Sequence, residues 1–182
     1  KELRELDMEK VRFSVDFAAK EPGTDGCDTV RFLMSANAGE ALRPISKIAS
    51  GGELARIMLA LKNVLAEQEQ IATLGFDEVD TGVSGRAAQK VAEKLAQLAC
   101  HKQVLCVTHL PQLAAMAGTH FLVEKGEQNG RTFTKVVELD REARKAEIAR
   151  ITGGSQVTDA LLASAADILN QAAAYRAQLR ER

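Results

Sequence analysis

The stretch IASGGELARIMLALK, residues 48–62, places two adjacent glycines where an amphipathic helix begins. Apolar residues recur along it at spacings of three and four, which predicts a helix over residues 51–66 with one buried face. A glycine within a helix costs roughly 1 kcal/mol relative to alanine. The presence of both Gly51 and Gly52 at this point therefore requires a physical reason.

Two interpretations of the glycines are open. Ser50 and Glu53 fit a capping box, in which each side chain binds a backbone N–H group at the start of the helix. That structural interpretation requires no glycine between them. In the other interpretation the bare backbone leaves the N–H groups accessible to an anion such as phosphate, which the positive end of the helix attracts.

The middle of the chain alternates strands and helices. Apolar runs predict buried strands, and amphipathic stretches predict helices, in the order strand 71–76, helix 84–99, strand 102–109 and helix 110–117. This alternation is typical of a parallel sheet covered by helices, so the expected fold class is α/β with a mostly parallel central sheet. β-Hairpins are predicted on both sides of this section, the first with a long loop over 20–27 and the second over 119–139, and two helices follow Asp140.

Polar clusters follow both central strands, at Asp77–Glu78–Asp80 and at Thr108–His109. In parallel sheets ligands gather at the carboxyl ends of strands. A strand that ends in two adjacent carboxylates has the layout of a Walker B segment, in which Asp77 would reach Mg²⁺ through water and Glu78 would orient or deprotonate the attacking water. The structural alternative is an ordinary acidic loop, and for His109 it is a surface or core histidine.

Composition narrows the class of protein. The chain has 182 residues, 46% hydrophobic and 27% charged, with a net charge of −1, which is typical of a globular domain and gives no global attraction for nucleic acid or a membrane surface. Cys27, Cys100 and Cys106 lack metal-ligand spacing and are expected to be reduced thiols, as in a cytoplasmic protein. No apolar run approaches the roughly 20 residues of a membrane span.

The order of SGGE at 50–53, DE at 77–78 and TH at 108–109 resembles the signature motif, Walker B segment and switch histidine of ABC-type ATPases. The glutamate in SGGE is similar to the SMC-like branch of that superfamily. Four longer strings resemble the RecN family of bacterial ATPases that repair DNA double-strand breaks, and the resemblance covers essentially the whole chain: IASGGELARIMLALK, FDEVDTGVSGRAA, CVTHLPQLAAMA and ITGGSQVTDALLASAADIL.

The resemblance implies that residues 11–182 are the C-terminal half of an ABC-type, P-loop NTPase head, and that residues 1–10 end a coiled-coil arm. The expected activity is ATP hydrolysis with Mg²⁺ in DNA repair and recombination. The chain contains no G-x-x-x-x-G-K-[ST] phosphate loop, so it is expected to be an enzyme only when completed by an N-terminal half that carries one. The other expected partners are a second head, joined through ATP as a homodimer, and DNA with broken ends or single strands; no membrane partner is expected, and the location would be cytoplasmic and nucleoid-associated.

By the same resemblance, particular residues receive roles. The residues that would contact the nucleotide are Ser50, Gly51, Gly52, Glu53 and Ser84. Asp77 would hold the metal ion. Glu78 and His109 would be catalytic. Ser84 departs from the pattern of related heads, which often carry an aspartate at that position. This departure leaves its part in communication between two active sites open.

Other classes of function are still compatible with the sequence. The chain could be a non-catalytic interaction or dimerisation module, or an ABC ATPase subunit of another system such as a transporter. ATPase activity of the chain alone, compared with the chain plus an N-terminal half, separates the first alternative from the enzyme. An unrelated α/β domain with an acidic strand end is disfavoured because three motifs occur in the expected order.

Overall fold

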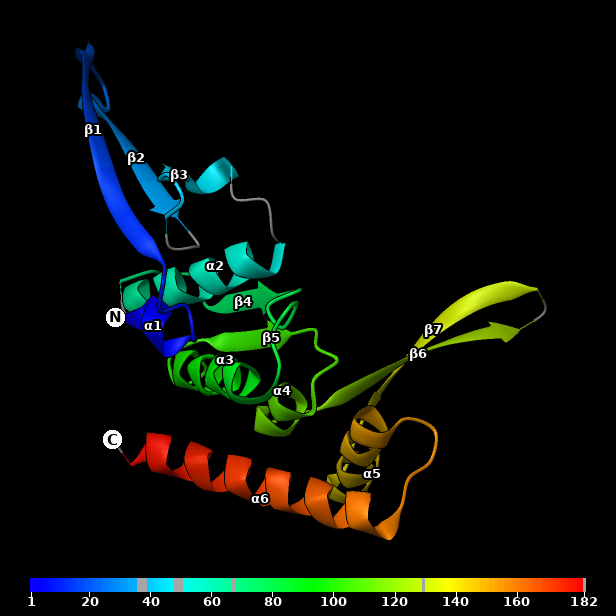
Figure 1. Ribbon diagram of the computed structural model, residues 1–182. Helices are drawn as coiled ribbons and strands as arrows, with labels where there is room; N and C mark the ends of the chain where they lie inside the picture. Colours follow the sequence, from blue (N-terminus) through cyan, green and yellow to red (C-terminus); the bar gives the residue numbers. More distant parts are fainter. Residues whose placement is uncertain (36–38, 48–50, 67, 129, 182) are drawn as a thin grey trace.

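The computed structural model describes residues 1–35, 39–47, 51–66, 68–128 and 130–181 (Figure 1). Its elements follow the chain in this order: α1 (Glu2–Glu5), β1 (Arg12–Gly23), β2 (Gly26–Ser35), β3 (Arg43–Pro44), a 3₁₀ turn η1 (Ile45–Lys47), α2 (Gly51–Leu65), β4 (Thr73–Phe76), α3 (Gly85–Leu98), β5 (Gln103–Cys106), α4 (Pro111–Met116), β6 (Phe121–Gln128), β7 (Arg131–Glu138), α5 (Arg141–Gly153) and α6 (Asp159–Arg180). The mixed α/β architecture expected from the sequence is confirmed.

The site is built on the parallel pair β4–β5. Thr73 lies opposite Gln103 and Phe76 opposite Cys106, so the two strands end at the same edge. Helices α2 and α3 pack with this pair around an apolar core that includes Leu59, Val79, Val91 and Leu98, each fully buried. The buried face of α2 differs from the one that the apolar spacing predicts, because Leu59 and Ala60 are buried whereas Met58, Val64 and Leu65 are exposed.

The strand after α4 does not extend this parallel pair. In the described residues β6 pairs only with β7, in an antiparallel hairpin that projects from the body of the molecule (Figure 1). The hairpin expected at 119–139 is confirmed. The strand–helix–strand–helix–strand order alone overstates the parallel sheet, because the tight turn between β6 and β7 brings neighbouring strands together before a distant pairing forms.

The N-terminal hairpin is also confirmed, with one difference. Strands β1 and β2 run almost to the turn, where Gly23 pairs with Gly26, so the long loop expected over residues 20–27 is largely strand. A register shift between Ala19 and Gly23 absorbs the extra residues, and Lys20 forms an ion pair with Asp25 at 2.7 Å. The hairpin projects away from the helices and adds the short strand β3 (Figure 1).

The last two helices support α4. Asp140 caps α5 by accepting a hydrogen bond from the N–H of Ala143 at 2.8 Å, and α6 runs along one side of the molecule (Figure 1). Arg144 on α5 donates to the carbonyl of Ala117 at 2.8 Å, and Arg176 on α6 donates to that of Met116 at 3.0 Å. These arginines bind carbonyl groups that the end of α4 leaves without intrahelical partners.

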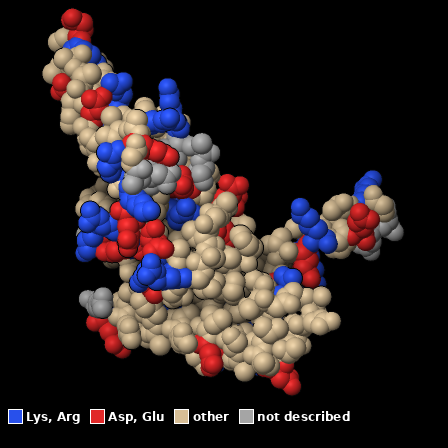
Figure 2. Space-filling model, in the orientation of Figure 1, with Lys and Arg blue, Asp and Glu red and all other residues tan. Residues whose placement is uncertain are grey.

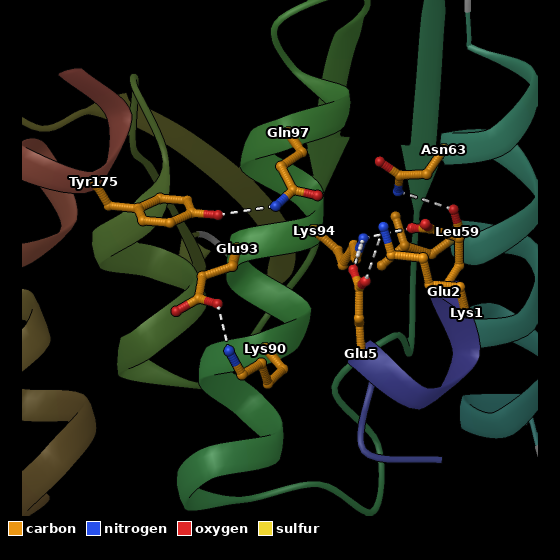
Figure 3. A network of polar contacts seen from close by, with 10 residues as sticks. All are labelled: Lys1, Glu2, Glu5, Leu59, Asn63, Lys90, Glu93, Lys94, Gln97 and Tyr175. Atoms are coloured by element: carbon orange, nitrogen blue, oxygen red, sulfur yellow. Dashed lines mark hydrogen bonds and ion pairs between the residues drawn. The ribbon is translucent and has the colours of Figure 1, made fainter. Parts of the chain in front are cut away.

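Ion pairs join the short helix α1 to α3 (Figure 3). The buried Lys94 binds the carboxylates of both Glu2 and Glu5. Leu6, 1% exposed, enters the core beside them. The helix ends at Glu5, and whether residues 1–10 continue a coiled-coil arm stays a prediction.

Across the part of the chain that the structure describes, none of the helices combines the length and the apolar character needed to cross a membrane.

Candidate functional site

The two glycines at the start of α2 have different surroundings. Gly52 is buried, and a Cβ atom placed on it would lie 2.5 Å from the carbonyl oxygen of Thr81. The backbone of the β4–α3 loop therefore passes too close for any side chain at this position. Close packing within the chain is thus a sufficient reason for Gly52 to be glycine.

Gly51 is exposed, and its neighbour is a side chain rather than backbone. A Cβ atom placed on it would touch Oε2 of Glu78. The structure thus brings the start of α2 and the end of β4 together. A carboxylate at this position is favoured by the positive end of the helix. Ser50, predicted both as a cap and as a nucleotide contact, lies outside the described residues.

Asp77 and Glu78 are both exposed at the carboxyl end of β4. Glu78 has a backbone φ of +59°, a region that residues other than glycine rarely adopt, and its N–H donates to Oδ1 of Asp77 at 2.9 Å. Its carbonyl accepts from the N–H of Thr81 at 3.0 Å, which closes a turn. Backbone strain of this kind is concentrated at functional sites, where the surrounding structure holds it in place.

Asp80 differs from the two preceding carboxylates because it is buried, only 3% exposed. Its Oδ2 accepts a hydrogen bond from the Thr108 hydroxyl at 2.5 Å and another from the His109 N–H at 3.0 Å. The His109 side chain is 73% exposed, and its Nδ1 lies 3.2 Å from the same oxygen. Asp80 therefore joins the two polar clusters that follow β4 and β5. The sequence places Asp80 in the acidic cluster after β4 but gives it no role of its own.

Arg56 connects α2 to the same loop. Its Nη1 donates to the carbonyl of Thr81 at 2.8 Å, and the side chain is 7% exposed. Burial lowers the pKa of the guanidinium, and the negative charge of Glu53 opposes that shift. In the described chain, Nε of Arg56 is buried without a hydrogen-bond partner. Arg56 and Gly52 both hold α2 against Thr81, and neither contact could be read from the local sequence.

Two further residues predicted to contact the nucleotide are Glu53 and Ser84. Glu53 is partly buried in the first turn of α2, where its charge acts on Arg56. Ser84 is exposed and begins α3 as its N-cap residue, with φ −154° and ψ 169°, and its hydroxyl makes no capping hydrogen bond. The roles of Glu53 and Ser84 in nucleotide contact stay predictions.

The exposed carboxylate of Asp77 suits Mg²⁺ but does not form a complete site by itself. Among the residues that the structure describes, no cluster of three or more His, Cys, Asp or Glu side chains is arranged to hold a metal ion. Mg²⁺ keeps much of its water and is commonly bound by one or two carboxylates together with substrate phosphates. One exposed carboxylate at a strand end fits that mode of binding.

Solved structures of other proteins share the fold of this chain. Over 83% of this chain the fold matches the Smc head domain of Pyrococcus yayanosii, with a TM-score of 0.61 and 19% identity, covering 28% of that chain. It also matches over 83% of this chain the Smc head of Pyrococcus furiosus bound to the C-terminal domain of ScpA, with a TM-score of 0.57 and 20% identity, covering 36% of that chain. The fold is therefore that of part of an Smc head domain.

Sequence comparison finds more similar relatives than the comparison of folds. The chain is 44% identical over 188 residues to the DNA repair protein RecN of Bacillus subtilis, an alignment that covers 94% of this chain and 33% of that protein. It is 44% identical over 169 residues to RecN of Vibrio cholerae, covering 92% and 30% respectively. No family model matches the chain. By sequence, it is thus related to RecN along nearly its whole length, and it spans about one third of the length of these relatives.

Proposed function

We propose that this chain is the part of a RecN-type ATPase head that supplies the signature segment, the Walker B carboxylates and the switch histidine. The observation that carries the proposal is the meeting of three segments at one edge: the start of α2 at Gly51, the end of β4 at Glu78, and His109 after β5, joined through Asp80. The relatives named DNA repair protein RecN support a role in DNA repair.

In the proposed reaction, each part of the site has a separate task. Gly51 leaves the positive end of α2 accessible from outside, where its N–H groups would receive the terminal phosphate of an ATP molecule held by a second head. Glu78 would orient the attacking water, and His109 would contact the terminal phosphate of ATP. Asp77 would hold Mg²⁺, which when bound offsets negative charge that develops on the phosphate oxygens.

The proposal assigns the phosphate loop to the rest of the protein. The present sequence has no such loop, so the chain would bind ATP only together with an N-terminal half, and dimerisation of two heads would complete the signature contact. A structural neighbour with a TM-score of 0.50 and 19% identity comes from work on ATP-driven dimerisation and DNA-stimulated activation of SMC ATPases, which supports this arrangement. Broken DNA ends or single strands are the proposed target of the assembled protein.

The experiment is Glu78→Gln in the complete protein. The amide keeps the shape of the side chain but loses its basicity, so hydrolysis should slow by about 10²–10⁴-fold while ATP binding is retained. ATP-bound dimers should then accumulate in sedimentation velocity. The matched control is Glu124→Gln on the distant β6–β7 hairpin, which should hydrolyse ATP at the parent rate. Parent-rate hydrolysis by Glu78→Gln would show that Glu78 does not have the proposed role.

A non-catalytic role is favoured for the chain when it is alone, because it lacks the phosphate loop. Measuring ATP hydrolysis by the chain, and again after adding the missing N-terminal half, tests this. Activity of the chain alone would contradict the composite site.

A further inference from the structure

The proposed function gives no chemical task to the buried carboxylate of Asp80, which lies beside the exposed side chain of His109. Asp80 is 3% exposed and belongs to the loop after β4, whereas Thr108 and His109 follow β5. Within the described part of the chain, three polar groups from these two residues lie against Oδ2 of Asp80: the hydroxyl of Thr108, the backbone N–H of His109 and its ring Nδ1. A buried carboxylate requires such partners, and here they hold the two loops together.

The donors around Asp80 can be assigned from the surrounding contacts. Thr108 Oγ1 accepts a hydrogen bond from the N–H of Leu110 at 3.0 Å, so its own hydrogen is left for Asp80 at 2.5 Å. The His109 N–H, at 3.0 Å, can only donate. Oδ2 of Asp80 is therefore an acceptor for both groups. An ionised carboxylate only accepts, so the approach of His109 Nδ1 to 3.2 Å is favourable when Nδ1 carries the hydrogen.

The geometry points to Asp80 as a positioning residue that holds His109 with the hydrogen on Nδ1 and leaves Nε2 as the nitrogen that meets a ligand. The bond made by one ring nitrogen decides the state of the other, and a carboxylate partner of Nδ1 is a common arrangement. The His109 side chain is otherwise 73% exposed, so Asp80 supplies the described contact that orients its ring. Resting on the proposed function, Asp80 would direct Nε2 toward the terminal phosphate of ATP, to which Nε2 donates in the imidazolium form, where both ring nitrogens carry a hydrogen.

The loop that carries Asp80 also contacts helix α2. Thr81, the next residue, accepts a hydrogen bond from Arg56 and packs against Gly52. Asp80 and Thr81 thus connect the start of α2 to His109 through two consecutive residues. A movement of α2 on binding a nucleotide would reach His109 through this pair.

The test measures the position of the ring hydrogen without nucleotide. The chain has three histidines, so ¹⁵N-labelled His109 can be assigned by comparison with His109→Gln. In the parent chain at a pH where the ring is neutral, the majority form should carry hydrogen on Nδ1. In Asp80→Asn, the amide oxygen that takes the place of Oδ2 is a weaker acceptor than a carboxylate, so the fraction of His109 with hydrogen on Nδ1 should fall. Asp77→Asn, which changes an exposed carboxylate in the same cluster, should leave His109 as in the parent.

A second pair of variants covers the case in which Asp80→Asn does not fold. Thr108→Val removes the hydroxyl that donates to Asp80 and should lower the fraction of His109 with hydrogen on Nδ1. Thr108→Ser keeps a hydroxyl and should leave that fraction as in the parent chain. A parent chain with hydrogen mainly on Nε2, or an unchanged form in a folded Asp80→Asn, would overturn the assignment. If Asp80→Asn does not fold, identical spectra for Thr108→Val and Thr108→Ser would overturn it.

The role in hydrolysis is tested separately in the complete protein. Asp80→Asn should lower kcat about 10–100-fold and change KM much less, as expected for a partner that orients a functional group. An unchanged kcat together with an altered ring form would overturn the role in hydrolysis. Failure of the Glu78→Gln experiment would remove the proposed reaction but leave the ring assignment standing, so the two results can be distinguished.

Discussion

At the scale of single residues, the adjacent glycines of α2 should respond differently to the same substitution. In Gly52→Ala the new methyl group would meet the Thr81 carbonyl at 2.5 Å, and backbone cannot easily move away, so a loss of about 1–3 kcal/mol in the free energy of unfolding is expected. In Gly51→Ala the new group meets the end of the flexible Glu78 side chain, which can rotate. Alanine also favours helix by up to about 1 kcal/mol, so Gly51→Ala should be neutral or stabilising.

Urea denaturation of the two variants and the parent chain checks this difference. Equal stabilities for Gly51→Ala and Gly52→Ala would mean that the loop at Thr81 does not press on α2.

Cys106, at the end of β5, should be the least reactive cysteine of the chain. Burial raises the pKa of its thiol to about 12, and the negative charges of Asp80 and Asp77 add to the shift. At pH 8 about one thiol in ten thousand is then ionised, and thiolate is the reactive form. Iodoacetamide should therefore modify the exposed Cys27 and Cys100 well before Cys106, as followed by mass spectrometry.

The pH dependence of the alkylation rate tests the raised pKa of Cys106. Because the pKa lies above the experimental range, the alkylation rate of Cys106 should still rise about tenfold from pH 9 to pH 10. A rate that levels off below pH 10 would contradict a raised pKa.

At the scale of elements, the attachment of α1 depends on one buried lysine. Lys94 on α3 lies between the carboxylates of Glu2 and Glu5, and its ammonium lowers the pKa of Glu5 through their hydrogen bond (Figure 3). Lys94→Ala would leave these carboxylates facing each other without a cation. Both are partly exposed, so the expected loss of about 1–3 kcal/mol lies below that for a fully buried pair.

The matched control for Lys94 lies one turn away on the same helix. Lys90 pairs with Glu93 on α3 itself and is exposed, so Lys90→Ala should change stability by less than about 0.5 kcal/mol. Because the folded-state pKa of Glu5 is lowered, its contribution is present above its unfolded pKa and is lost as the pH falls through the folded pKa. The difference between Lys94→Ala and the parent in urea denaturation should therefore shrink in acid; a constant difference would contradict the ion pair.

Elements could be predicted from the sequence where the signal is local. The apolar spacing in α2 and α3 and the turn residues between β6 and β7 each identify their element, because helix faces and tight turns depend on nearby residues. The contact of Gly52 with Thr81 and the bond of Asp80 to Thr108 join residues far apart in the chain. Such contacts depend on how loops meet at the strand ends, so the candidate site could be outlined from motifs while its connecting residues could not.

At the scale of the whole molecule, two kinds of surface are apparent. Charged side chains of both signs are interspersed over the upper part of the view in Figure 2, and a large area below them is uncharged. Beside β5 and β6 there is a hollow of about 1750 Å³, lined partly by exposed apolar side chains. Leu105, Val107, Phe121 and Val123 are each more than half exposed there. A set of this size is unusual on a surface that faces only water.

If an N-terminal half completes the head, as proposed above, we expect it to cover this hollow in the complete protein. Val107→Asp tests the expectation, because Val107 is 67% exposed in the chain alone. In the isolated chain the aspartate would be hydrated, and stability should change by less than about 0.5 kcal/mol. In the complete protein a covering segment would bury the charge, and the loss should reach about 2–4 kcal/mol. Urea denaturation of Val107→Asp is measured in the isolated chain and in the complete protein, and the isolated chain serves as the control. Equal small losses of stability in the two would mean that the hollow stays open to water.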